Sequence, residues 1–459
     1  MIAISVSSVA QILKAKMINI DADYDITGVS TDSRSVKPGE IFFALRGDKF
    51  DGHDFIASLP RGVCAVAERD TGSGAPMLLV NDTYEALGKL GMAIKDKLSL
   101  KHTVGITGSV GKTTTKEFVA CILKRSFDTH STPGNYNNRI GLPLTLAGLT
   151  EQTEALVCEM GMSAPGEIDY LSSLCHPDIA IITNIGISHI ENLGSREAIR
   201  DAKLEITRHM KPGSVIILNG DEPLLRDEAA INTCKSRKLK VIYAGFGPNN
   251  DIYPSDILNN HRTVSFDIIT ESCERRIVLP AVGDHFVMNA LFAFAAGQVC
   301  GVSPDEIQKG LAEYKPQGLR QKIYVKNGIT VIADCYNAGP ESMTAALKVI
   351  GNYDKRRIAV LGDMLELGLM STTAHRAVGK EASARIDYMF AYGKAAADIV
   401  KGACEAGLAS DKCFFFEDKT SLSDTLGSFI KPGDTILFKA SRRMKLEDVI
   451  DSLGLSEEI

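Results

Sequence analysis

Short apolar runs alternate with helix-length amphipathic stretches along most of this chain, and the alternation divides it into three segments. In the first segment, up to about residue 97, four β-like runs are separated by turn sequences. They cover residues 28–31, 41–45, 63–67 and 77–80. A helix is predicted to begin after Asp82 as its N-cap and to end near residue 98, with its apolar residues on one face.

In the second segment, residues 98–314, strands and helices are predicted to alternate. This is the pattern of a mostly parallel sheet with helices on both faces. The predicted strands are 102–107, 155–160, 178–184 and 214–219, and the predicted helices are 112–125, 165–174 and 195–211. A more β-like stretch, with runs at 264–269 and 276–279, then precedes a helix over 285–299.

The alternation restarts at about residue 315 and predicts a second, Rossmann-like α/β unit. Its predicted strands are 329–333, 357–361, 386–391, 413–416 and 435–439. The stretch 312–322, which contains Pro316 and Gly318, is the candidate hinge. We therefore predict an α/β protein with domains at 1–97, 98–314 and 315–459, and the length of 459 residues agrees with about three domains.

The composition is that of a soluble globular protein, with 44% apolar and 24% charged residues. No apolar run approaches the ~18 residues that would span a bilayer, and the first sixteen residues lack the basic region of a signal peptide. The ten cysteines show no C-x-x-C spacing, which is typical of reduced, buried thiols in a cytoplasm. A net charge of −6 without a basic block argues against a nucleic-acid partner. We expect a cytoplasmic monomer without stable membrane insertion.

Residues 105–116, GITGSVGKTTTK, read as a phosphate-binding loop between a strand and a helix. Gly108 and Gly111 allow successive N–H groups to point at anionic oxygens, Lys112 adds a positive charge, and the hydroxyl of Thr113 can hold Mg²⁺. The G-x-x-x-x-G-K-[ST] pattern is missed because position 106 is Ile, so an ordinary glycine-rich turn is the alternative. The G-K-T-T ending and the strand–helix context favour binding of a nucleoside triphosphate.

Two further strand ends present polar residues at the edge of the sheet that carries this loop. Strand 155–160 delivers Glu159. Strand 178–184 ends in Asn184 and is followed by a loop that contains His189. A lone Glu and a lone His are more often structural than functional. Because ligands collect at the carboxyl ends of parallel strands, both side chains are candidate Mg²⁺ ligands or phosphate neighbours.

Lys203 falls within the apolar stripe that Ile199, Ile206 and Met210 form on the predicted helix 195–211, so it points inward. Taken alone, this position favours a lysine whose stem packs while its ammonium reaches water. The alternative is conversion by CO₂ to a carbamate, an anionic oxygen ligand suited to Mg²⁺.

Together these motifs make the chain resemble the Mur ligase family, ATP-dependent amide-bond ligases of peptidoglycan precursor synthesis, over its whole length. The loop 107–113 matches the family's ATP loop. The stretches 159–161, 184–189 and 202–206 match its metal-site and carbamylated-lysine signatures. The stretches 134–145, 334–343 and 361–368 imply the ligation of D-alanyl-D-alanine to UDP-N-acetylmuramoyl-tripeptide through an acyl phosphate. Gly339 and Ala440 depart from the residues usual in their motifs, Asn and Gly.

The resemblance also implies roles for individual residues. The implied catalytic residues are Lys112, His189, Lys203 and Arg320. ATP is expected at Thr107, Gly108, Ser109, Val110, Gly111, Lys112, Thr113, Asn289, Arg320 and Asp334. Two Mg²⁺ ions are expected at Thr113, Glu159, His189 and Lys203, the last as its CO₂-derived carbamate. The UDP substrate is expected at Ser33, Arg34, Asn135, Asn137 and Asn138, and the acceptor at Asn337 and Pro340.

Three other functions remain to be weighed. A ligase adding a diamino acid to the UDP-linked dipeptide would typically carry an Asp-Asn-Pro-Arg acceptor motif, and the sequence has none. A P-loop NTPase used as a switch would typically carry a base-specificity motif, and no Asn-Lys-x-Asp guanine motif is present. A non-catalytic nucleotide-binding module is disfavoured because Glu159, His189 and Lys203 are all present.

Overall fold

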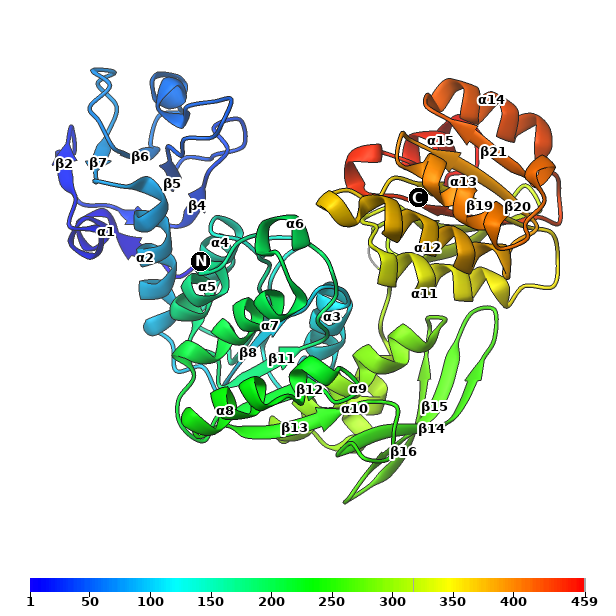
Figure 1. The fold of residues 1–459 in the computed structure, drawn as a ribbon. Helices are drawn as coiled ribbons and strands as arrows, with labels where there is room; N and C mark the ends of the chain where they lie inside the picture. The colour runs from blue at the N-terminus through cyan, green and yellow to red at the C-terminus, as the bar shows by residue number, and fades with distance from the viewer. Residues whose placement is uncertain (317, 458–459) are drawn as a thin grey trace.

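The computed structural model describes residues 1–316 and 318–457 and contains three α/β units in chain order (Figure 1). Position 317, inside the predicted hinge, and positions 458–459, at the end of the third predicted domain, lie outside the described residues. The predicted fold class is confirmed: each unit is built on a mostly parallel sheet.

In the N-terminal unit the main sheet has the order β2-β7-β6-β5-β4, parallel except for the antiparallel pair β2–β7, and β1 pairs with β3. The bounds are β1 Ile4–Ser5, α1 Val6–Leu13, β2 Lys16–Ile18, β3 Asp25–Ile26, β4 Gly28–Ser30, β5 Glu40–Phe43, β6 Cys64–Ala67, β7 Met77–Leu79 and α2 Thr83–Asp96. Asp82 caps α2 as predicted, because its side chain accepts a hydrogen bond from the N–H of Glu85.

The sheet of the central unit has the order β16-β15-β14-β13-β12-β11-β8-β10-β9, parallel from β9 to β14 and antiparallel beyond. Its strands are β8 His102–Thr107, β9 Thr129–Ser131, β10 Ala155–Glu159, β11 Ile179–Ile182, β12 Val215–Asn219, β13 Lys240–Ala244, β14 Ile252–Asn259, β15 Val264–Thr270 and β16 Glu274–Leu279. Its helices are α3 Lys112–Leu123, α4 Gly141–Ala147, α5 Glu167–Cys175, α6 Ile190–Leu193, α7 Arg196–Leu204, α8 Glu228–Ser236, α9 Asp284–Val299 and α10 Pro304–Ala312.

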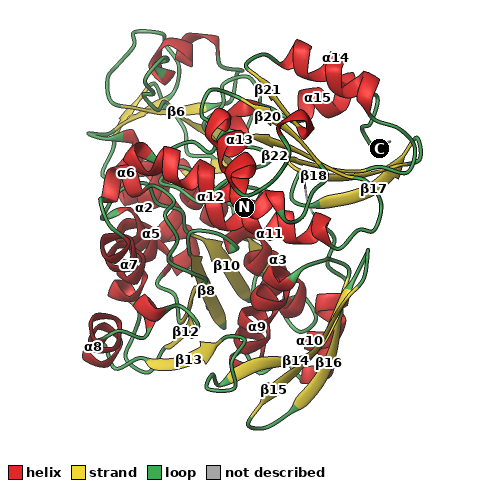
Figure 2. Ribbon diagram, turned by 45° about the vertical axis from the view of Figure 1, so that its right-hand side comes forward, coloured by secondary structure: helices red, strands yellow, loops and turns green. Residues whose placement is uncertain are grey.

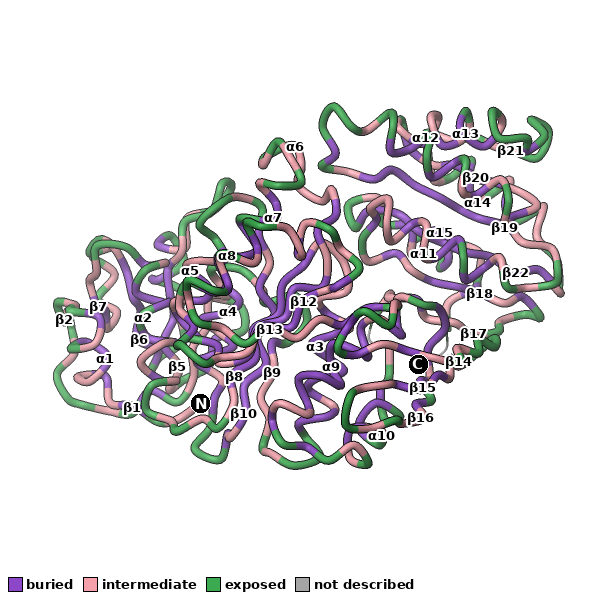
Figure 3. Tube along the Cα trace, turned by 60° about the horizontal axis from the view of Figure 1, so that its bottom comes forward, coloured by how far each residue is buried: buried purple, intermediate pink, exposed green. Residues whose placement is uncertain are grey.

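Alternate residues of the central strands face two different cores, because side chains on a strand alternate between the faces of a sheet. Ala180 and Ile182 of β11 pack in a core with α5 and α7, whereas Ile179 and Ile181 pack in another with α3 and α9. Figure 2 shows these helices on opposite sides of the sheet, and Figure 3 shows β8 and β12 buried between them. Burial on both faces explains the near-continuous apolar runs of these strands.

The C-terminal unit repeats this design with the strand order β17-β18-β22-β19-β20-β21, parallel except for β17. Its strands are β17 Lys322–Lys326, β18 Ile329–Asp334, β19 Arg357–Gly362, β20 Tyr388–Tyr392, β21 Cys413–Phe416 and β22 Thr435–Lys439. Its helices are α11 Pro340–Gly351, α12 Ser371–Ser383, α13 Ala396–Glu405, α14 Lys419–Phe429 and α15 Glu447–Ser452. Across the described ranges of the chain, no helix is long and apolar enough to cross a membrane.

The predicted helix 195–211 is wrong in its second half, because α7 ends at Leu204 and a 3₁₀ turn covers Glu205–His209. The Glu205 carboxylate accepts hydrogen bonds from the N–H groups of Gly166 and Asp169 at the start of α5. These contacts come from a neighbouring helix, so the periodicity of the segment could not reveal them. The predicted strand 386–391 likewise begins two residues later, at Tyr388.

Candidate active site

The predicted phosphate-binding loop joins β8 to α3, and two of its glycines occupy positions that exclude a side chain. Gly108 and Gly111 have φ angles of 152° and 85°. A Cβ on Gly108 would lie 1.8 Å from Oγ1 of Thr183, and one on Gly111 would lie 2.6 Å from Oδ1 of Asn289. The glycines therefore allow the loop to pass close against β11 and α9.

Asn184, at the end of β11, fixes the start of this loop. Its Oδ1 accepts hydrogen bonds from the N–H groups of Ser109 at 2.9 Å and Val110 at 3.0 Å. In return, Ser109 Oγ accepts from the N–H of Gly186 at 2.9 Å. Sequence reasoning placed Asn184 at this edge of the sheet but missed its bonds to the loop, which only the pairing of β8 with β11 brings about.

Lys112 opens α3 and turns its ammonium back over the loop. Nζ donates to the carbonyls of Gly108 at 2.7 Å and Ser109 at 3.2 Å. Burial lowers the pKa of Lys112, while the nearby charge of Glu159 acts in the opposite direction. The loop thus holds a cation that an anionic ligand could draw out of its carbonyl contacts.

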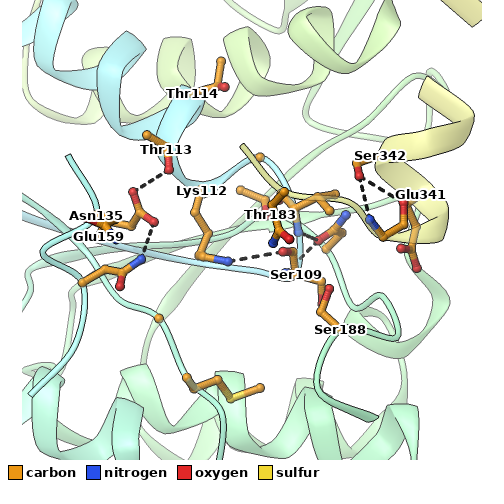
Figure 4. A pocket seen from close by; sticks show the side chains of 18 of the residues that line it. Ser109, Lys112, Thr113, Thr114, Asn135, Glu159, Thr183, Ser188, Glu341 and Ser342 are labelled. Carbon is orange, nitrogen blue, oxygen red and sulfur yellow. Dashed lines mark hydrogen bonds between the residues drawn. The ribbon is translucent and has the colours of Figure 1, made fainter. Parts of the chain in front are cut away.

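Glu159 ends β10 beside this lysine and is 2% exposed. Its Oε2 accepts from the Thr113 hydroxyl at 2.8 Å (Figure 4). Its Oε1 accepts from Nδ2 of Asn137 at 2.7 Å. Within the described residues, no three His, Cys, Asp or Glu side chains gather into a metal-binding cluster. A cation at Glu159 would therefore have to take further oxygen ligands from the hydroxyl of Thr113, from a modified residue or from a bound substrate.

Lys203 is 3% exposed, so the interpretation of a lysine that carries its ammonium into water is wrong. Burial lowers the pKa of Lys203 well below its usual range, and the positive charge of Lys112 lowers it further. The surroundings of Lys203 therefore shift its amine towards the neutral form.

His189 lies where the central and C-terminal units meet. Its Nδ1 is 2.9 Å from Oε2 of Glu366, and Oε1 of the same carboxylate accepts from Arg443 at 3.2 Å. Both His189 and Glu366 have left-handed backbones, with φ of 61° and 65°. Burial lowers the pKa of His189, Glu366 opposes this shift, and the charges of Lys112 and Lys203 reinforce it.

From the C-terminal unit, charged residues at the ends of β18 and β22 reach the same region. Lys439 Nζ donates to Asp334 at 2.6 Å and to the carbonyl of Asn337 at 3.1 Å. The guanidinium of Arg320 lies 3.7 Å from the centre of the Tyr336 ring, which holds this arginine in place.

A cavity of about 1280 Å³ collects these groups from all three units. The predicted site residues that line it are Ser109, Val110, Gly111, Lys112, Thr113, Asn135, Asn137, Asn138, Glu159, His189, Asn289, Arg320, Asp334 and Asn337. Those that do not line it are Ser33, Arg34, Thr107, Gly108, Lys203 and Pro340. Arg34 instead pairs with its neighbour Asp32, and Pro340 is the first residue of α11.

Sequence reasoning missed several residues that line the cavity. Asp82 and Glu85 bring the start of α2 to its rim, while Ser188 and Glu341 belong to the facing edges of the central and C-terminal units. Glu341 lies within the stretch 334–343 that was assigned to the acceptor, which was the available signal for it.

Sequence models of known families match each unit of the chain. They are the Mur ligase family catalytic domain at residues 25–92, the Mur ligase middle domain at 106–297 and the Mur ligase glutamate ligase domain at 320–442. A Bacillus subtilis (strain 168) protein named UDP-N-acetylmuramoyl-tripeptide–D-alanyl-D-alanine ligase is 40% identical over 99% of both chains. A protein of the same name from Escherichia coli (strain K12) is 33% identical over 99% of both.

Solved structures agree with these matches. MurF from Acinetobacter baumannii superposes with a TM-score of 0.89 at 31% identity and covers 98% of both chains. The MurF ligase from Thermotoga maritima in complex with ADP gives a TM-score of 0.82 at 29% identity, over 93% of this chain and 97% of that one. Because the likeness extends over the full length and includes all three units, the chain belongs to the Mur ligase family.

Proposed function

We propose that this protein joins D-alanyl-D-alanine to UDP-N-acetylmuramoyl-tripeptide at the expense of ATP, in the synthesis of peptidoglycan precursors. The observation that carries this proposal is the single cavity in which the phosphate loop faces Asp334 and Asn337 of the C-terminal unit and Asp82 of the N-terminal unit. A ligase with three substrates needs such a meeting point. The names of relatives that share the full length of this chain support the choice of substrates.

Each domain would bring one substrate to this cavity. We assign UDP-sugar-peptide binding to 1–97, ATP binding to 98–314 and acceptor binding to 315–459. Asn135, Asn137 and Asn138 line the cavity and are proposed contacts of the UDP substrate, together with Ser33 and Arg34 farther out. The ATP set is proposed as the phosphate loop from Thr107 to Thr113 with Asn289, Arg320 and Asp334.

The reaction has two steps that concentrate negative charge. The tripeptide carboxylate attacks the γ-phosphorus of ATP, giving an acyl phosphate and ADP, and the acceptor amine then attacks the acyl carbon and expels phosphate. Catalysis would rest on positioning and on fixed charges, with Lys112 and Arg320 as the cations beside the phosphates. A cavity shared between domains would also keep water from the acyl phosphate.

The residues present fit a magnesium site with a lysine carbamate. The Thr113 hydroxyl and the Glu159 carboxylate lie 2.8 Å apart and offer hard oxygen ligands, and His189 and Lys203 are the other proposed holders of two ions. When bound, Mg²⁺ would neutralise charge on the phosphate oxygens. The neutral amine that burial favours at Lys203 is the form that adds to CO₂, forming an N–C bond and releasing a proton.

We further propose that the protein acts in the cytoplasm as a monomer. All ten cysteines are free thiols, which agrees with a reducing compartment. Size-exclusion chromatography with light scattering measures the oligomeric state directly, and a dimer would contradict this part of the proposal.

A mixture assay tests the function. Purified protein, ATP and Mg²⁺ are incubated with UDP-linked tripeptide and D-alanyl-D-alanine, then with each component omitted, and phosphate release is measured. We expect release only in the complete mixture, and mass spectrometry should find the UDP-linked pentapeptide. Ligation of a diamino acid to the UDP-linked dipeptide would instead assign the preceding reaction, and phosphate release without any acceptor would indicate an NTPase.

A further inference from the structure

Glu341, in the first turn of α11, reaches across from the C-terminal unit and contacts the loop that follows β11. Its Oε1 accepts a hydrogen bond from the N–H of Ile187 at 3.2 Å. A Cβ placed on Gly186 would lie 2.6 Å from this oxygen and 3.1 Å from Cβ of Ser109 in the phosphate loop. The Glu341 carboxylate and Ser109 of the phosphate loop therefore both lie close to Gly186, and Figure 4 shows Ser109 and Glu341 in the same part of the cavity.

The second oxygen of this carboxylate has no partner. Of the residues that line the cavity, Glu341 is the one with a buried side-chain oxygen, Oε2, that lacks a hydrogen-bond partner within the described part of the chain. Nor does any described Lys, Arg or His form an ion pair with Glu341. A buried carboxylate oxygen left unpaired is unfavourable, and unpaired groups of this kind call for a ligand or a functional explanation.

Open space lies beside this oxygen because residue 339 has no side chain. A Cβ on Gly339 would have Oε2 of Glu341 and Oγ of Ser188 as its nearest neighbours, both at 3.9 Å. The space is thus bordered by a carboxylate oxygen and a hydroxyl oxygen, both hydrogen-bond acceptors. A small cation with several N–H donors suits such a site.

We propose that Glu341 Oε2 and Ser188 Oγ bind the ammonium group of the acceptor substrate. This inference rests on the proposed ligase function and names the contact that holds the acceptor nitrogen before it attacks. The ammonium loses a proton to solvent to become the nucleophilic amine, and a second proton leaves with the expelled phosphate when the amide bond forms. ATP on the phosphate loop brings negative charge close to Glu341, so the carboxylate needs a compensating cation. The acceptor supplies one, because a free α-amino group is largely protonated near neutral pH.

The test measures initial rates of ligation for the full-length protein and two variants. Glu341→Gln keeps the size of the side chain and an acceptor for Ile187 N–H but removes the charge. Gly339→Ala adds a methyl group to the open space, and its extended backbone (φ −149°) accepts any residue. Glu405→Gln, at an exposed position on α13, is the matched control. Circular dichroism melting curves confirm that each variant folds.

We expect Glu341→Gln to raise the KM for D-alanyl-D-alanine about tenfold or more, with the KM for ATP and for the UDP-linked tripeptide within about twofold. Gly339→Ala should raise the acceptor KM in the same selective way, and Glu405→Gln should change nothing. If Glu341→Gln leaves the acceptor KM unchanged, the proposal is wrong and Glu341 serves only as a contact between the domains. An altered Mg²⁺ dependence with an unchanged acceptor KM would overturn the proposal in favour of a metal ligand.

Failure of the proposed function looks different from failure of this inference. If the unmodified protein does not ligate D-alanyl-D-alanine, the proposed function is wrong, and the variants are then compared with the amine that it does ligate. If the unmodified protein ligates D-alanyl-D-alanine and both variants have the same acceptor KM as the unmodified protein, only the ammonium site is wrong.

Discussion

At the scale of single residues, Lys112 is the cation of the phosphate loop. Its ammonium donates to backbone carbonyls of the loop and is not part of the hydrophobic core. Lys112→Ala should therefore keep the fold but lower kcat/KM by about 100-fold or more, because the phosphates lose a fixed positive charge. Melting curves and phosphate-release rates provide the measurement. Lys124→Ala, exposed at the end of the same helix, is the control. Normal turnover and ATP affinity in Lys112→Ala would contradict the assignment of the loop.

Lys203 offers a second residue-scale prediction, because its buried amine suits a carbamate. Lys203→Ala should lose activity and regain part of it with formate or acetate, small anions that can replace the missing oxygen ligand. With ¹³C-labelled bicarbonate, the unmodified protein should show a carbamate NMR signal that the variant lacks. Activity of the variant without added anions would leave Lys203 without this role.

The ion pair between His189 and Glu366 is partly exposed to solvent, and this exposure limits the free energy that the pair contributes. The two side chains are 30% and 49% exposed, and such pairs contribute at most about 1 kcal/mol. Glu366→Gln should therefore lower kcat no more than about fivefold, and the difference from the unmodified protein should shrink at high salt. Rates measured across a series of NaCl concentrations check this. If the decrease in kcat of Glu366→Gln stays the same at high salt, the Glu366 carboxylate has a role beyond its electrostatic attraction to His189.

At the scale of elements, the junction of β8 and α3 depends on glycine for two separate reasons, conformation and space. In Gly111→Ala the new side chain has to adopt a positive φ and also clashes with the Asn289 side chain. In Gly213→Ala, at φ 89°, the backbone is equally unfavourable but there is no clash. Gly213→Ala should cost about 1–2 kcal/mol of unfolding free energy and leave the KM for ATP unchanged. Gly111→Ala should in addition raise the KM for ATP. Urea unfolding and steady-state kinetics separate the two effects, and equal ATP kinetics would show that the contact with Asn289 is unimportant.

For the molecule as a whole, a few polar contacts link the C-terminal unit to the central one near the cavity, among them Glu341 with Ile187 and His189 with Glu366. Small polar interfaces between domains are weak without ligands. We therefore expect the domains to move about the 312–322 segment and to close on substrates. Small-angle X-ray scattering should show a smaller radius of gyration after a non-hydrolysable ATP analogue and UDP-linked tripeptide are added. An unchanged radius would contradict this.

The cavity shows which residues of the C-terminal unit come close to the phosphate loop in this arrangement of the domains. Asp334 and Lys112 line the same cavity, whereas Arg442 does not line it. The order of domains follows from the sequence, but the distance between them depends on contacts such as Glu341–Ile187 that no local pattern encodes.

The sequence by itself determined the α/β class, the strand and helix positions around the phosphate loop, and the inward direction of Lys203. These features depend on periodicity and on neighbours within a few residues, such as Gly108, Gly111 and Lys112 on one turn. The 3₁₀ turn after Leu204 escaped prediction because Glu205 bonds to another helix.

Only the tertiary structure decided which side chains meet. Strand pairing brings Asn184 to the phosphate loop, and domain packing brings Glu366 to His189 and Glu341 to Gly186. It also buried the ammonium of Lys203, which the sequence alone would allow to reach water, because the degree of burial depends on what covers a helix face. Periodicity sets the direction of a side chain, whereas its partners and its pKa depend on residues that are distant in the sequence.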